Sequence, residues 1–242
     1  MAPSAPAAGI PQGTQVFTGL RIPKVEASIL EVRQDGSTGK SLRIIKETFI
    51  GRGTCDASYP NDVLLAPRHA SVAKREGKVY LKDLGSTNGT FVKLRQDAEL
   101  VAGDVFLIGR ELFRFATQRL DEAPLGEGTV VMRGAPSLQA GPITAKLEHI
   151  QLNGDVSRVY SLDKAETVIG RTTGDLVFKD DPYMSGKHAR IIVQPGRFVL
   201  QDLQSRNGVY RRIKGEVEMR DADEFFLGEQ LFRVTIQKIL ES

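Results

Sequence analysis

The sequence predicts an all-β protein in which two antiparallel β-sandwich domains are arranged in tandem and joined by a flexible linker. Three observations lead to this prediction. Short motifs recur at one constant offset, the segments between them are short, β-branched and divided by turn residues, and a Pro- and Gly-rich stretch separates the two sets. A chain of 242 residues with 40% hydrophobic content is large enough for two packed cores.

The repeat is the strongest of these observations. Each of four separated motifs returns 119 residues later, without an insertion between the motifs: Ile50-Gly51-Arg52 as Ile169-Gly170-Arg171, His69-Ala70 as His188-Ala189, Asn88-Gly89 as Asn207-Gly208, and Leu112-Phe113-Arg114 as Leu231-Phe232-Arg233. Chance can supply one such match, but four in a single register indicate two copies of one domain. We assign the copies to residues 25–118 and 143–242.

The remaining segments have the composition of a tail and a linker. Residues 1–24 are rich in Pro and Ala and are expected to be disordered, because such a segment buries little apolar surface. Residues 119–142 hold several Pro and Gly without sustained periodicity and are expected to form the linker.

Within each copy the apolar segments have the length of strands. They are Val79–Leu84, Gly89–Val92 and Asp104–Ile108 in the first copy, and Phe198–Leu203 and Phe225–Leu227 in the second. The dipeptides Asn88-Gly89 and Asn207-Gly208 predict tight turns. In a sandwich of this kind we expect the functional residues on loops that gather at one end.

The segment Gly36-Ser37-Thr38-Gly39-Lys40-Ser41 resembles a nucleotide-binding loop only superficially. The motif requires a Gly at position 34, which is Gln34, and no helix is predicted after it. We therefore expect a hairpin loop.

Charge and composition exclude several classes of function. A formal net charge of +3 does not indicate a nucleic-acid-binding protein. The main basic cluster, Arg211, Arg212 and Lys214, is interpreted as a solvated strand end, with a phosphate-backbone contact as the alternative. The single Cys55 permits no intramolecular disulfide. The absence of a signal sequence and of a long apolar run predicts a cytoplasmic protein.

The order of the repeated motifs resembles the forkhead-associated (FHA) domain. The second copy has Gly170-Arg171, then Ser185-Gly186-Lys187-His188, then Ser205-Arg206-Asn207-Gly208, and the first has Gly51-Arg52, His69 and Ser86-Thr87-Asn88-Gly89. The resemblance implies a β-sandwich that binds phosphothreonine on partner proteins, such as a Ser/Thr kinase or its substrates. It also implies that His188 and His69 are structural, together with Gly170 and Gly51.

The residue types suit a phosphate reader. A dianionic phosphate needs a cation and hydroxyl or amide donors, because charge-assisted hydrogen bonds are about twice as strong as neutral ones. In the second copy Arg171 would supply the cation and Ser185 the hydroxyl, while Asn207 would hold the backbone of the ligand. Further candidates for phosphopeptide binding are Gly186, Lys187 and Arg206 there, and Arg52, Arg68, Thr87 and Asn88 in the first copy.

The first copy departs from the pattern at the hydroxyl. Its position equivalent to Ser185 is Ala66, followed by Pro67 in place of Gly186. A lost hydroxyl donor to a charged group costs about 1.5–3 kcal/mol. The first copy is therefore expected to be the weaker reader, or to bind a partner without phosphate, or to orient the second copy.

Two threonines outside the copies are candidate phosphorylation sites. Thr14 and Thr129 both lie in the pattern Gly-Thr-x-Val-x-x-Gly. Once phosphorylated, either could be captured by a site of the same chain or of a second copy, which gives a route to self-association. Chance, or a first edge strand, is the alternative explanation of this pattern.

Catalysis is not expected. The three histidines, His69, His149 and His188, are not accompanied by a nucleophile or by metal-ligand spacing. No cofactor and no metal are predicted. The sequence thus favours an adaptor that depends on phosphothreonine, and the alternative is a scaffold that assembles a complex independently of phosphate.

Overall fold

The computed structural model describes residues 24–33, 35–119 and 143–239, and within these ranges every regular element is a β-strand. The first repeat contributes β1 (Lys24–Val32), β2 (Thr38–Arg43), β3 (Glu47–Gly51), β4 (Ala57–Ser58), β5 (Ala70–Arg75), β6 (Lys78–Asp83), β7 (Thr90–Lys93), β8 (Ala98–Leu100), β9 (Val105–Ile108) and β10 (Glu111–Arg119). The second contributes β11 (Ile143–Ile150), β12 (Val156–Ser161), β13 (Glu166–Gly170), β14 (Leu176–Val177), β15 (Ala189–Gln194), β16 (Arg197–Asp202), β17 (Val209–Arg212), β18 (Glu216–Met219), β19 (Glu224–Leu227) and β20 (Gln230–Ile239).

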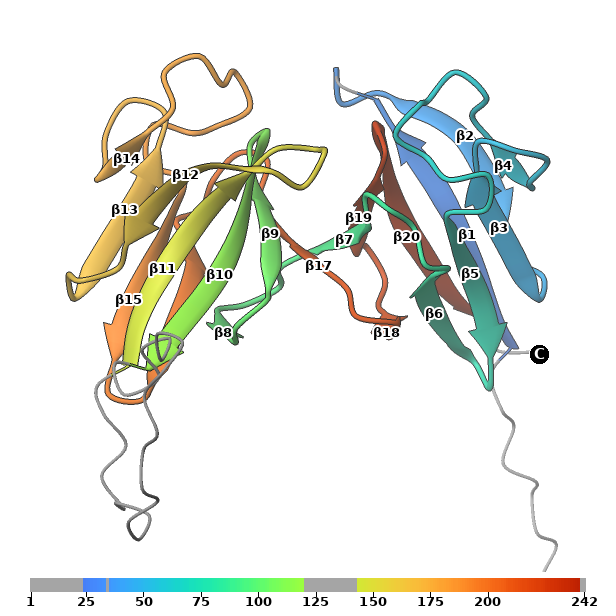
Figure 1. Cartoon of the computed structure of the whole chain (residues 1–242). Helices are drawn as coiled ribbons and strands as arrows, with labels where there is room; N and C mark the ends of the chain where they lie inside the picture. Colours follow the sequence, from blue (N-terminus) through green and yellow to red (C-terminus); the bar gives the residue numbers. More distant parts are fainter. Residues whose placement is uncertain (1–23, 34, 120–142, 240–242) are drawn as a thin grey trace, which may run out of the picture.

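These strands form two sandwiches that share one long sheet (Figure 1). The shared sheet has ten strands in the order β12-β11-β10-β9-β17-β7-β19-β20-β1-β2. One half of it faces the five-stranded sheet β18-β6-β5-β3-β4, and the other half faces the five-stranded sheet β14-β13-β15-β16-β8. The predicted all-β fold with two sandwiches is confirmed.

The two repeats exchange their last three strands. Strands β18, β19 and β20 of the second repeat pair with β6, β7 and β1 of the first. Reciprocally, β8 and β10 of the first repeat pair with β16 and β11 of the second, and β9 pairs with β17. We call β1–β7 with β18–β20 the first sandwich, and β8–β17 the second sandwich.

Each hydrophobic core is built from both repeats. In the first sandwich Phe225 and Phe232 of the second repeat stack on each other, with ring centroids 5.2 Å apart, and Phe232 meets Tyr59 of the first repeat edge-on at 5.9 Å. The second sandwich has the equivalent arrangement with the repeats reversed: Phe113 of the first repeat lies 5.8 Å from Phe106 and meets Phe178 of the second repeat edge-on at 5.6 Å. The ranges 25–118 and 143–242 therefore mark the repeats, while each folded unit takes strands from both.

The chain crosses between the sandwiches at β7 and β17, which lie side by side in the middle of Figure 1. The two strands pair antiparallel, and Val92 faces Arg211, its own equivalent in the repeat. A pseudo-twofold axis therefore passes through this pair, as expected when two copies of one unit exchange equal segments.

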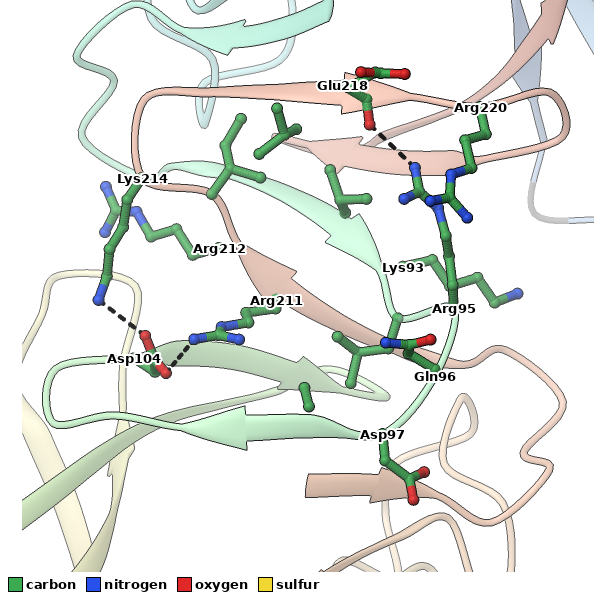
Figure 2. Close-up of a pocket in the computed structure, with 15 residues that line it drawn as sticks. Lys93, Arg95, Gln96, Asp97, Asp104, Arg211, Arg212, Lys214, Glu218 and Arg220 are labelled. Atoms are coloured by element: carbon green, nitrogen blue, oxygen red, sulfur yellow. Dashed lines mark hydrogen bonds and ion pairs between the residues drawn. The ribbon is translucent and has the colours of Figure 1, made fainter. Parts of the chain in front are cut away.

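Ion pairs between the two repeats stabilise the region where β7 and β17 cross (Figure 2). The Asp104 side chain is 1% exposed and binds Arg211 and Lys214 of the other repeat, as Figure 2 shows. Reciprocally, Asp223 of the second repeat binds Arg95 of the first. The structure adds to the sequence interpretation of this basic cluster, because Arg211 and Lys214 both pair with a buried carboxylate, although the Lys214 side chain stays 64% exposed. A buried carboxylate needs such partners to offset its desolvation.

The local predictions hold closely. Each predicted strand segment overlaps an observed strand, and β1 and β2 form the antiparallel hairpin expected around Gly36. Of the tail only Lys24, in β1, and of the linker only Arg119, in β10, are described, and the rest of both segments lies outside the described residues. In the described ranges no helix has the length and apolar character to cross a membrane.

Candidate functional site

The repeated motifs of the second copy lie together in one cluster of loops in the second sandwich. Arg171 follows the last residue of β13, Ser185 lies in the loop before β15, and Arg206 and Asn207 form the turn between β16 and β17. Arg171 and Ser185 are half-buried, and Arg206 is exposed. The structure thus brings together the residues predicted to bind phosphate.

Hydrogen bonds fix these loops to one another. The Arg171 amide donates to the Ser185 carbonyl at 2.9 Å, and the Arg206 amide donates to Ser185 Oγ at 3.0 Å. Asn207 Nδ2 donates to the Tyr183 carbonyl at 2.7 Å. Ser185 Oγ accepts the bond from Arg206, and among the described residues the hydroxyl donates to no acceptor, so its proton can be donated to an incoming one.

His188 is structural, as the resemblance implies. It is fully buried, its Nδ1 accepts the Ser185 amide at 3.0 Å, and its Nε2 lies 3.0 Å from the Gly208 carbonyl. Since Nδ1 accepts, Nε2 carries the proton and donates it. Burial lowers the pKa of His188 and outweighs the hydrogen bond to Gly208, so the neutral ring is favoured. The ring therefore ties the Ser185 loop to the Asn207 turn.

The close approach of the loops explains the glycine before the arginine. A Cβ on Gly170 would lie 2.2 Å from the Gly186 carbonyl oxygen, and one on Gly51 would lie 2.4 Å from the Pro67 carbonyl oxygen. Real Cβ atoms do not approach carbonyl oxygens so closely, and only glycine lets the two loops pack. Lys187, beside Gly186, is exposed at the rim.

The first sandwich repeats this scaffold without the hydroxyl. The Arg52 amide donates to the Ala66 carbonyl at 2.9 Å, and Asn88 Nδ2 donates to the Leu64 carbonyl at 2.7 Å. His69 is fully buried, accepts the Ala66 amide at 3.1 Å and donates to the Gly89 carbonyl at 3.0 Å. Ala66 has no side-chain oxygen that could accept the Thr87 amide, whereas the equivalent Arg206 amide donates to Ser185 Oγ.

Arg68 does not take over the role of the missing hydroxyl in this structure. Its guanidinium carbon lies 3.8 Å from the centroid of the Phe49 ring, which is a cation–π contact. Arg52 is exposed, and among the described residues its guanidinium has no partner. The first site therefore keeps its cation and its asparagine but has lost one donor.

Sequence analysis missed two aspartates that support the loops. Asp181 is 4% exposed and accepts the Arg110 amide at 2.7 Å and the Tyr183 amide at 2.8 Å. Its equivalent, Asp62, accepts the Glu229 amide at 2.8 Å. Each aspartate thus joins the loop before its site residues to a turn of the other repeat. The offset of 119 residues was a signal that could have identified this pair.

Other features predicted from the sequence fall outside this cluster. Thr14 and Thr129 lie outside the described residues, and their phosphorylation stays a prediction. In the part of the chain that the structure describes, no group of His, Cys, Asp and Glu side chains could hold a metal ion.

Comparisons with known proteins agree with the repeat. The family model "FHA domain" matches residues 48–109 and 167–228. A curated relative, the oxoglutarate dehydrogenase inhibitor of Corynebacterium glutamicum, is 29% identical over 118 residues, which are 48% of this chain and 80% of the relative.

Two solved structures are similar to about a third of this chain. EmbR of Mycobacterium tuberculosis, solved in complex with a low-affinity phosphopeptide, is 32% identical with a TM-score of 0.22, over 35% of this chain and 23% of EmbR. The FHA domain of the CT664 protein of Chlamydia trachomatis is 26% identical with a TM-score of 0.21, over 34% of this chain and 87% of that domain.

The family match covers half of the chain, in two copies whose position agrees with the repeated loops. The chain therefore belongs to the family of proteins with FHA domains, which are phosphothreonine-binding modules of Ser/Thr kinase signalling.

Proposed function

We propose that this protein is a non-catalytic adaptor that binds phosphothreonine on partner proteins, mainly through the site of the second sandwich. The observation that carries the proposal is the hydrogen bond from the Arg206 amide to Ser185 Oγ. Ser185 Oγ accepts this bond, and in the described part of the chain the hydroxyl has no acceptor of its own, so it can donate to a phosphate close to the loop that carries Arg171.

Charge supports the same assignment. Among the described residues the Arg171 guanidinium has no side-chain partner, whereas Arg190, Arg211 and Arg233 are all paired with carboxylates. A cation that the protein leaves unpaired beside a free hydroxyl is suited to a dianion, because hydrogen bonds with two charged partners are the strongest. Asn207 fixes the turn through Nδ2 and keeps its carbonyl oxygen for the backbone of a peptide.

The first sandwich would be the weaker reader. Ala66 cannot donate to a phosphate, and the cost of about 1.5–3 kcal/mol corresponds to a loss of roughly ten- to a hundredfold in affinity. The remaining candidates, Arg52, Thr87 and Asn88, hold the same loop positions as their counterparts in the second repeat.

The relatives support a regulatory role. One is named as an inhibitor of an enzyme, and a further structural relative, the FhaA FHA domain, was solved in complex with the intracellular domain of Rv3910; it is 25% identical with a TM-score of 0.19, over 32% of this chain and 87% of that domain. Partners of this chain would be phosphothreonine-containing proteins, such as a Ser/Thr kinase or its substrates.

The test uses the full chain and pairs of peptides that differ only in phosphorylation of one threonine. A peptide array gives the preferred sequence, and fluorescence anisotropy gives the affinities of the wild type, Arg171→Ala and the matched Arg52→Ala variant. We expect binding of the phosphorylated peptide alone, a loss of at least tenfold in Arg171→Ala and a small change in Arg52→Ala. Binding that survives both dephosphorylation and Arg171→Ala would instead support the phosphate-independent scaffold.

A further inference from the structure

Each asparagine-glycine turn of the candidate sites is contacted by a cationic side chain of the other repeat. Lys93 of β7 lies against Gly208: a Cβ on this glycine would be 2.2 Å from Lys93 Cε and 3.1 Å from Cδ. The residue before Gly208 is Asn207, which the proposed function places against the backbone of the ligand. The contact exists because β7 pairs with β17, in which Lys93 faces Tyr210.

The reciprocal contact is made by Arg212, the equivalent of Lys93. A Cβ on Gly89 would lie 2.2 Å from Arg212 Nε, and Arg212 Nη2 donates to the carbonyls of Ser86 and Thr87 at 3.2 and 3.3 Å. Lys93 and Arg212 project to opposite sides of the crossing strands (Figure 2). The crossing therefore sends one side chain to each turn.

Lys93 is itself held in place. Its Nζ binds Glu224 Oε2 at 3.0 Å, and the Glu224 side chain is 12% exposed. Glu224 Oε1 also accepts Arg233 Nη2 at 2.7 Å. With its ammonium fixed at one end and its backbone in a sheet at the other, the Lys93 stem is restrained where it packs on Gly208. An immobilised neighbour restricts the turn, whose glycine has a φ of +84° that only glycine adopts without strain.

We infer that Lys93 is a positioning residue for the phosphopeptide site of the second sandwich, and Arg212 its counterpart for the first. This inference rests on the proposed function. Each site would then be completed by a residue of the repeat that does not contain it. Lys93 acts through Asn207: without it the turn samples more conformations, and a bound peptide dissociates faster because ordering the turn is then part of binding.

The experiment measures phosphopeptide affinity at the second site in the full chain. The variants are Lys93→Ala, Lys93→Arg and the matched Arg212→Ala, all in an Arg52→Ala background that silences the first site. We expect Lys93→Ala to weaken binding roughly three- to tenfold, as for coupled residues in contact, mainly through the dissociation rate. Lys93→Arg should restore most of the affinity, because the first sandwich uses arginine at this position, and Arg212→Ala should leave the second site unchanged.

The outcomes separate this inference from the proposed function. If the Arg52→Ala background binds no phosphopeptide, the proposed function fails first. If it binds and Lys93→Ala binds equally well, the positioning role is overturned. An equal loss in Lys93→Ala and Arg212→Ala, accompanied by equal drops in thermal unfolding temperature, would mean that both act only on global stability and would also overturn it. The amide signal of the Asn207 side chain, followed by NMR, should shift in Lys93→Ala and not in Arg212→Ala.

Discussion

At the scale of single residues, the two sites form a natural comparison in which one hydroxyl differs. Ser185 Oγ accepts the Arg206 amide, whereas Ala66 has no side-chain oxygen for the equivalent Thr87 amide. We predict that Ser185→Ala lowers phosphopeptide affinity of the second site by about ten- to a hundredfold, since about 1.5–3 kcal/mol is lost with a donor to a charged group. Calorimetric titration of the full chain measures this directly.

The converse substitution is the control. Ala66→Ser should raise the affinity of the first site, which is measured in an Arg171→Ala background. The gain is expected to be smaller than the loss at Ser185, because Pro67 follows the new hydroxyl and Arg68 stays on the Phe49 ring. Equal affinities of Ser185→Ala and the wild type would show that the hydroxyl does not contact the phosphate.

At the scale of the elements, the two buried histidines predict how stability depends on pH. Burial lowers the pKa of both His69 and His188 below the ordinary value of 6.5. In the unfolded chain the rings take up protons near pH 6.5, while in the folded chain they stay neutral to lower pH. Unfolding is therefore favoured as the pH falls below about 6.5, and the loss levels off below the folded pKa values.

Urea unfolding between pH 7.5 and 5 measures this effect. The free energy of unfolding should fall across that range, and a double His69→Gln, His188→Gln variant, although less stable, should show a flatter profile. Because a protonated His188 can no longer accept the Ser185 amide, phosphopeptide affinity should weaken only at a pH low enough to protonate the folded ring, below the range in which the unfolded chain takes up its protons. A wild-type profile that is flat or rises toward pH 5 would contradict the neutral, buried state of these rings.

The loop before β15 yields a further prediction. Asp181→Ala removes the buried carboxylate that accepts the Arg110 and Tyr183 amides, and the loss of a hydrogen bond to a charged group costs about 1.5–3 kcal/mol. The neighbouring Asp180 is exposed and serves as the matched control, because Asp180→Ala removes the same charge without a buried contact. Equal unfolding free energies of the two variants would refute the role of Asp181 in joining the repeats.

Much at this scale could be predicted from the sequence. The β-branched segments and the asparagine-glycine turns located the strands and turns, because alternation and turn chemistry are local properties. The order of the motifs also predicted that Arg171, Ser185 and Asn207 lie in one cluster of loops, as the structure has them, while their binding to phosphate stays a prediction. The structural role of Asp62 and Asp181 was not predicted, because the sequence around an aspartate does not indicate whether its side chain is buried. The only signal was that the aspartate recurs after 119 residues.

At the scale of the whole molecule, the exchange of strands could not have been predicted. Strands β18–β20 are near-copies of β8–β10, so either set presents an equivalent apolar face to either core. Phe232 and Phe113, for example, are repeat equivalents and are both buried. The periodicity of the sequence predicts that one face of each strand is buried, but it does not predict in which of the two equivalent cores that face packs. In the structure the exchange is accompanied by ion pairs between the repeats, such as Arg95 with Asp223.

The exchange has a consequence for experiments on separate repeats. Residues 25–118 alone would lack β18–β20, and with them Phe225 and Phe232 of the first core. Such a fragment must either fold β8–β10 back onto its own core or leave that core open. Binding by the sites is therefore best compared in the full chain, with Arg52→Ala and Arg171→Ala as the selective variants.

Cleavage of the linker tests most directly whether the two repeats are interlocked by the exchange of β8–β10 and β18–β20. A specific protease site placed within residues 120–142 would cut the chain into two fragments, which are then analysed by size exclusion with light scattering under native conditions. Since each core needs strands from both fragments, we predict that they remain together as one particle with the mass of the intact chain and separate only in denaturant. Two folded fragments that elute apart after cleavage, each with its own phosphopeptide affinity, would contradict the exchange.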